Sequence, residues 1–118
     1  MEDFGINEML EMQRELQKRY ADIWEGISPQ VGKNKLLWMV GEIGEVIDIV
    51  KKHDADQLCQ EEPTRRQLVE ELADVLMYYS DVLLCYGISA EELRQTYAEK
   101  HIRNMARWEV PQRKETNS

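Results

Sequence analysis

The 118-residue sequence predicts an all-α protein built as a four-helix bundle. Apolar residues recur at helical spacing along most of the chain, and residues that start or end helices separate these stretches. Alternating patterns typical of strands are missing. A chain of this length can bury one hydrophobic core. We therefore expect one domain over residues 1–110, followed by a polar tail at residues 111–118.

The first two expected helices are separated by a glycine and a proline. The first covers residues 7–24 and ends at Gly26, since glycine readily adopts the left-handed conformation that closes a helix. The second opens at Ser28 and Pro29 and ends near residues 51–53. Its apolar residues give the strongest amphipathic pattern in the chain. They are Leu36, Met39, Val40, Ile43, Val46, Ile47 and Val50.

The third expected helix follows a polar connection. Residues 54–63 are acidic, end in a proline and predict a loop or one short extra turn. Thr64 and Gln67 have the spacing of a capping box, so the helix should start at Thr64. Gly87 should end it with a left-handed residue.

The fourth expected helix follows at once. Ser89 and Glu92 have the spacing of a second capping box, and Pro111 should end the helix. Apolar residues lie on more than one face of these helices, more than a single bundle of this size needs for its core. We therefore expect a homo-oligomer with closed symmetry.

Two acidic pairs are the most informative feature of the sequence. Glu42 and Glu45 are three residues apart in the second expected helix, as are Glu71 and Asp74 in the third, so each pair projects from one side of its helix. All four lie among apolar residues, where an ionised carboxylate needs a compensating partner. The connection at residues 54–63 lets the two helices run antiparallel and bring both pairs to one level. Four converging acids indicate a hard divalent metal ion.

Composition limits the classes of partner. The formal net charge is −8, which argues against a nucleic-acid polymer as partner, because such binding depends on cations that meet phosphates. No stretch approaches the length of a membrane-spanning segment, so we expect no membrane partner. Cys59 and Cys85 match no metal-ligand spacing and are expected to be reduced thiols. A cytoplasmic protein is the default expectation.

Three stretches carry a resemblance to a known family: NKLLWMVGEIGEV, LVEELADVLMYYSDVL and EKHIRNMARW. Together they resemble the MazG-like all-α nucleoside triphosphate pyrophosphohydrolases, including the dCTP pyrophosphatase branch. The family pattern is E-E-x-x-E, a spacer and E-x-x-D, and here Gly41 replaces the first glutamate. The Gly-Glu-x-Gly-Glu form resembles that of dCTP pyrophosphatases. The similarity extends over residues 34–108.

The resemblance implies a Mg²⁺-dependent hydrolase, with Mn²⁺ as a possible substitute, that converts a nucleoside triphosphate into the monophosphate and pyrophosphate for nucleotide-pool housekeeping. It implies metal binding by the four acids named above, with Glu42 or Glu45 as the base for an attacking water. It also implies phosphate contacts from Lys100 and Asn104, a homodimer or homotetramer, and a pyrimidine deoxynucleotide such as dCTP as first candidate substrate.

Three aromatic residues are candidates for base binding, because aromatic faces stack on nucleobases. They are Trp24, Trp38 and Tyr78, and the last matches a position near the nucleotide in dCTP pyrophosphatases. Trp38 lies at a core spacing, and packing is the more ordinary role for it.

Other interpretations stay open. The four acids could be solvated or could pair with cations; the candidate cations are Arg65, Arg66, Arg94 and Lys100. Asp48, Glu70 and Asp81 are expected to face water or to support the site indirectly. The chain could also be a non-catalytic helical module that binds a nucleotide or a protein. A di-iron bundle ranks last, because its Glu-x-x-His elements are missing.

Overall fold

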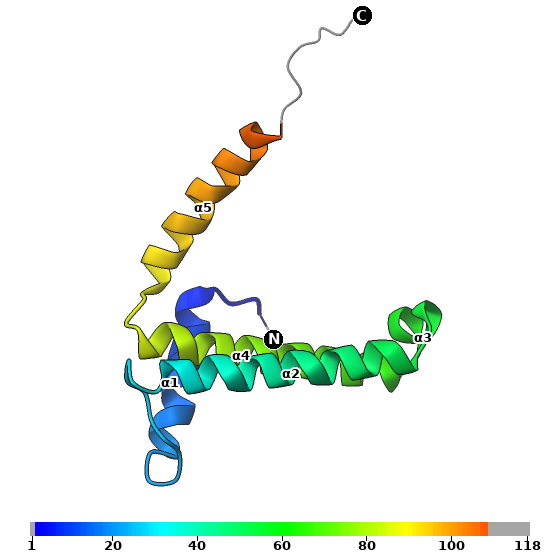
Figure 1. Cartoon of the computed structure of the whole chain (residues 1–118), viewed down its shortest axis with the longest axis horizontal. Helices are drawn as coiled ribbons and strands as arrows, with labels where there is room; N and C mark the ends of the chain where they lie inside the picture. Colours follow the sequence, from blue (N-terminus) through cyan, green and yellow to red (C-terminus); the bar gives the residue numbers. More distant parts are fainter. Residues whose placement is uncertain (1, 109–118) are drawn as a thin grey trace, which may run out of the picture. The chain divides into compact units, whose positions relative to one another are not determined.

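A computed structural model describes residues 2–108 of the chain, and it confirms the all-α prediction (Figure 1). This part of the chain contains five helices and no strand. One more helix forms than expected, because the polar connection is itself helical. The helices are α1 (Ile6–Arg19), α2 (Gly32–Lys52), α3 (Ala55–Gln60), α4 (Thr64–Cys85) and α5 (Ala90–Arg107).

The chain divides into two compact units, Met1–Ile88 and Ser89–Ser118, and each is described by itself. That residues 1–110 form a single domain stays a prediction. The expected tail at residues 111–118 lies outside the described residues, as does Pro111, and the last helix ends before that proline, at Arg107.

The first unit is organised around α2 and α4, which run antiparallel and side by side (Figure 1). Helices α1 and α3 both pack on α4. Buried apolar side chains from three helices form its small core, and they include Leu10, Ile49, Leu83 and Cys85. The antiparallel pair predicted to carry the acids is thus the main contact of the unit.

Helix α1 ends earlier than predicted. It stops at Arg19, and Tyr20 leaves the helical conformation with φ −109° and ψ 24°. The rings of Tyr20 and Trp24 stack with their centroids 4.9 Å apart, and they do so across the turn that follows the helix. Aromatic residues four apart mimic a helical pattern, so residues 20–24 were wrongly predicted to be helical. Gly26 does have a positive φ of 90°, as expected.

Helix α2 begins later than predicted. Pro29 lies in a turn, in which the carbonyl of Pro29 accepts a hydrogen bond from the Gly32 amide, and the helix starts at Gly32. Gly32 is buried, and any Cβ at this position would collide with the ring of Tyr86 at the end of α4. The start of α2 therefore packs directly against the end of α4.

The caps of α3 and α4 differ from the predictions. Asp54 caps α3: its side chain accepts a hydrogen bond from the Gln57 amide, and its amide donates to the Gln57 side chain. The predicted capping box of Thr64 and Gln67 is wrong, because Pro63 occupies the N-cap of α4 and no side chain caps it. Gly87 does adopt a positive φ of 67° after α4.

Helix α5 forms the described part of the second unit. Ser89 is its N-cap, and the Ser89 hydroxyl accepts a hydrogen bond from the Glu92 amide at 3.0 Å. The guanidinium of Arg107 lies 5.0 Å from the ring centre of Trp108, close enough for a cation–π contact.

Candidate metal site and adjoining pocket

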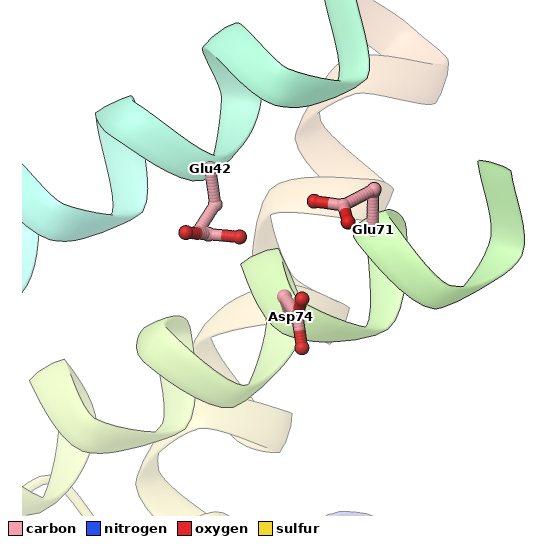
Figure 2. A group of neighbouring side chains, drawn as sticks. All are labelled: Glu42, Glu71 and Asp74. Carbon is pink, nitrogen blue, oxygen red and sulfur yellow. The ribbon is translucent and has the colours of Figure 1, made fainter. Parts of the chain in front are cut away.

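Three of the four predicted acids meet between α2 and α4. Glu42 on α2 and Glu71 and Asp74 on α4 each offer a carboxylate oxygen, and these oxygens lie within 4.8 Å of one another (Figure 2). We call these three residues the acidic trio. All three side chains are half-buried. The antiparallel packing of α2 and α4 brings them together, as the sequence predicted.

Glu45 lies outside the trio and is exposed. Its negative charge nevertheless acts on the trio, because it contributes to a raised pKa of Glu71. Its place three residues after Glu42 puts it on the same side of α2. Metal binding by Glu45 stays a prediction.

Electrostatic repulsion within the trio shows in the pKa of Glu71. Partial burial raises this pKa above its ordinary value of 4.5, the charges of Asp74, Glu42 and Glu45 raise it further, and a hydrogen bond with Glu42 adds to the effect. A bound cation would remove the repulsion and favour the charged carboxylate. Oxygen ligands of this kind suit Mg²⁺ or Mn²⁺, so the residues present fit a divalent metal.

Ion pairs inside the chain do not account for the trio. Within residues 2–108 the salt bridges are Arg14–Glu11, Lys35–Asp81 and Arg66–Glu70, and none includes a predicted metal ligand. The interpretation of the acids as partners of nearby arginines or Lys100 therefore finds no support in this part of the chain.

A pocket of about 330 Å³ adjoins the trio through Asp74. Its volume falls in the range of small-molecule sites. All three predicted base-binding residues, Trp24, Trp38 and Tyr78, line it. The remaining lining residues are Gln13, Leu16, Gln17, Glu25, Lys35, Met77 and Asp81.

The aromatic residues of the pocket differ in their surroundings. Trp38 is 58% exposed, so core packing within the chain, the more ordinary role expected for it, does not explain its position. Trp24 is held by its stack on Tyr20. Burial raises the pKa of Tyr78, and the nearby charges of Glu42, Asp81 and Asp74 raise it further, so its hydroxyl stays protonated and can donate a hydrogen bond at neutral pH.

A buried polar cluster at the pocket was missed by the sequence analysis. Asp81 is only 3% exposed, which corrects the expectation that it faces water. Gln13 and Gln17, one turn apart on α1, both donate hydrogen bonds from Nε2 to Asp81 Oδ1, at 2.8 and 3.1 Å. The ammonium of Lys35 lies 3.8 Å from Asp81 Oδ2. We call these four residues the Asp81 cluster.

One signal in the sequence could have indicated this cluster. Asp81 interrupts the apolar end of α4 and lies seven residues after Asp74, two helical turns along the same face. Its partners on α1 and α2 are distant in the sequence, so the spacing alone could not identify them.

Lys100 and Asn104, the predicted phosphate-binding residues, are exposed and lie one turn apart on α5. Their spacing gives one face of α5 a cation and an amide. Phosphate binding by these residues stays a prediction.

Comparisons with known proteins identify the family. A scan against protein-family models matched the MazG nucleotide pyrophosphohydrolase domain over residues 30–106, more than half of the chain. The searches of curated proteins and of solved structures found no match. The matched range starts two residues before α2 and ends within α5. A separate search of the described helices found none with the length and apolar character to cross a membrane.

Proposed function

Since the chain belongs to the MazG nucleotide pyrophosphohydrolase family, we propose that it hydrolyses a nucleoside triphosphate to the monophosphate and pyrophosphate with the help of Mg²⁺. The observation that carries this proposal is the acidic trio beside a pocket of nucleoside size. Mn²⁺ would serve in place of Mg²⁺ because it accepts the same oxygen ligands.

The trio would hold the metal through Glu42, Glu71 and Asp74, with Glu45 as a fourth ligand or as the base. A divalent metal at this place supplies charge that stabilises the phosphates and the leaving pyrophosphate. Of the two predicted bases, Glu45 is favoured here because it lies outside the trio and its carboxylate is exposed to water. It would accept a proton from the attacking water.

The contacts to the base and to the phosphates are proposed from the chemistry of the residues. Trp24, Trp38 and Tyr78 offer aromatic surface to a base in the pocket. Lys100 and Asn104 are proposed to contact phosphate oxygens. A pyrimidine deoxynucleotide such as dCTP is the first candidate, on the resemblance to dCTP pyrophosphatases, and a role in nucleotide-pool housekeeping in the cytoplasm goes with it.

We also propose that the protein works as a homodimer or homotetramer. Large apolar side chains on both central helices are about half exposed or more in the single chain. Many exposed apolar side chains on neighbouring helices are typical of a surface that contacts another protein. Those on α2 and α4 include Leu37, Val40, Ile47, Val69, Leu72 and Leu76. Light scattering would test this proposal, and a monomeric mass would contradict it.

The decisive experiment measures pyrophosphate and phosphate released from a panel of ribo- and deoxynucleoside triphosphates, with and without Mg²⁺. We expect pyrophosphate release that needs the metal and falls at least about a hundredfold in Glu71→Gln and in Asp74→Asn, as is usual when a group that stabilises transition-state charge is lost. Glu70→Gln is the matched control, because Glu70 is an exposed neighbour that pairs with Arg66. Absence of turnover from a folded protein would instead favour a non-catalytic binding module.

A further inference from the structure

One hydrogen-bond acceptor of the Asp81 cluster has no donor within the described part of the chain. Gln17 is 6% exposed, and its Oε1 is the only buried side-chain polar atom of residues 2–108 that lacks a hydrogen-bond partner. Such an atom is costly, because it has lost its hydration and gained no bond in exchange. Gln17 lines the pocket, so a ligand there is the natural source of the missing donor.

Asp81 fixes which end of the Gln17 amide remains unused. The Nε2 group donates to Asp81 Oδ1 at 3.1 Å, and a flipped amide would set its oxygen against the carboxylate. The other oxygen of this carboxylate, Oδ2, lies 3.8 Å from the ammonium of Lys35. Gln17 is therefore held with its oxygen as an acceptor.

Lys35 adds donors beside this acceptor. Lys35 as a whole residue is only 6% exposed, and it lines the same pocket. Its interaction with Asp81 spans 3.8 Å, which is too long for a good hydrogen bond. Asp81 is the only ion-pair partner of this ammonium among the described residues, which leaves donors for a ligand.

We propose that Gln17 and Lys35 read the pairing edge of a cytosine-type base, with Asp81 as the positioning residue. Among the pyrimidines, which the proposed function favours, cytosine carries an amino donor next to two acceptors, N3 and O2. This pattern complements one acceptor at Gln17 beside the donors of Lys35. Uracil carries a carbonyl in place of the amine, and this oxygen would face Gln17 Oε1 with no hydrogen between them. Turning uracil so that N3–H meets Gln17 leaves one of its carbonyls without a donor.

This inference rests on the proposed function, because it takes the pocket to be the place of the base. Oε1 is buried, so an entering base must displace neighbouring pocket side chains slightly to reach it. Tyr78 and the tryptophans would stack on the faces of the base, which does not distinguish one pyrimidine from another. Selection would then depend on Gln17 and Lys35.

The test compares kcat/KM for dCTP and dUTP. We expect the parent protein to prefer dCTP by about tenfold or more, the usual effect of leaving buried polar groups unpaired. In Gln17→Leu the ratio should fall close to one. Gln13→Leu is the matched control: it removes an equivalent hydrogen bond to the same Asp81 oxygen, and the ratio should persist. An equal loss of the ratio in both variants would overturn the proposal, since Gln17 would then act only by supporting Asp81.

A second experiment uses only the parent protein, so its result does not depend on whether a variant folds. The triphosphate of the 2-pyrimidinone deoxynucleoside lacks the amine of cytosine but keeps N3 and O2, so the parent should use it about tenfold less well than dCTP. Equal use of the two substrates would refute a contact with the amine.

Binding of dCMP and dUMP by calorimetry separates this inference from the proposed function. Preference for dCMP without turnover of any triphosphate would sustain the inference on base recognition and refute the hydrolytic function. Turnover with equal binding of the two monophosphates would sustain the function and refute the inference.

Discussion

Helix α4 carries two acidic sites, at Asp74 and at Asp81, two turns apart. They differ in how the cost of removing a charged carboxylate from water is offset. Asp81 is almost fully buried and has three partners from other helices: Gln13, Gln17 and Lys35. Asp74 belongs to the trio, in which desolvation and then the charges of the neighbouring carboxylates raise the pKa of Glu71. A carboxylate with internal partners holds the fold together, whereas a group of carboxylates without them is suited to an external cation.

The largest expected effect on stability comes from removing the positive charge of Lys35 beside Asp81. Lys35→Met keeps the length of the side chain but leaves Asp81 without its cation, and breaking a buried pair in this way costs about 3–5 kcal/mol. We expect the free energy of unfolding in urea to fall by this amount. Lys33→Met is the control, because Lys33 is an exposed residue of the same helix. A cost below about 1 kcal/mol would mean that the two amides alone stabilise the charge of Asp81.

The next largest effect on stability is expected when a metal ion binds to the acidic trio. A ligand that binds only the folded state at a hundred times its Kd stabilises that state by about 2.7 kcal/mol. Thermal unfolding should therefore shift upward when Mn²⁺ or Mg²⁺ is added to the parent. The shift should vanish in Asp74→Asn and persist in Glu70→Gln. An unchanged shift in Asp74→Asn would place the metal elsewhere.

A smaller effect depends on pH. Since the pKa of Glu71 in the folded protein lies above 4.5, this group stabilises the fold most below pH 4.5, and its contribution falls as the pH rises through the folded-state pKa. In metal-free protein with EDTA, Glu71→Gln should raise Tm at pH 7 and leave it nearly unchanged at pH 4. A lower Tm at pH 7 would show that the charged carboxylate has a partner that offsets the repulsion.

The smallest effect is expected at the surface of the same helix. Arg66 and Glu70 form an exposed pair at 3.5 Å, and such pairs contribute about 0–1 kcal/mol. A double-mutant cycle of Arg66→Gln and Glu70→Gln should give a coupling energy near the lower end of this range. A coupling as large as the cost of Lys35→Met would remove the distinction between buried and exposed pairs on α4.

The sequence predicted those parts of the fold that depend on local spacing. The end of α4 before the left-handed Gly87 and the convergence of Glu42 with Glu71 and Asp74 follow from residues a few positions apart, combined with one antiparallel connection. Tyr78, one turn beyond Asp74, lines the pocket together with that residue, and its role in base binding stays a prediction.

The rest depended on tertiary contacts. Asp81 finds its amide partners more than sixty residues earlier in the chain, and no local pattern specifies such pairs. The end of α1 was misjudged because Tyr20 and Trp24 stack in a turn with the spacing of a helix. The start of α2 depends on the close packing of Gly32 against Tyr86, and helix propensities cannot predict such a tertiary contact.

The close packing of Gly32 against Tyr86 limits how far α2 and α4 can slide along each other. Gly32 lets α2 rest against the Tyr86 ring, and a larger residue would push α2 along or away from its neighbour. One residue of helix rises about 1.5 Å, whereas metal–oxygen distances tolerate only about 0.2 Å. Glu42 is carried by one helix and its two partners by the other. The close packing at Gly32, ten residues before Glu42, thus helps to align the three carboxylates along the two helices.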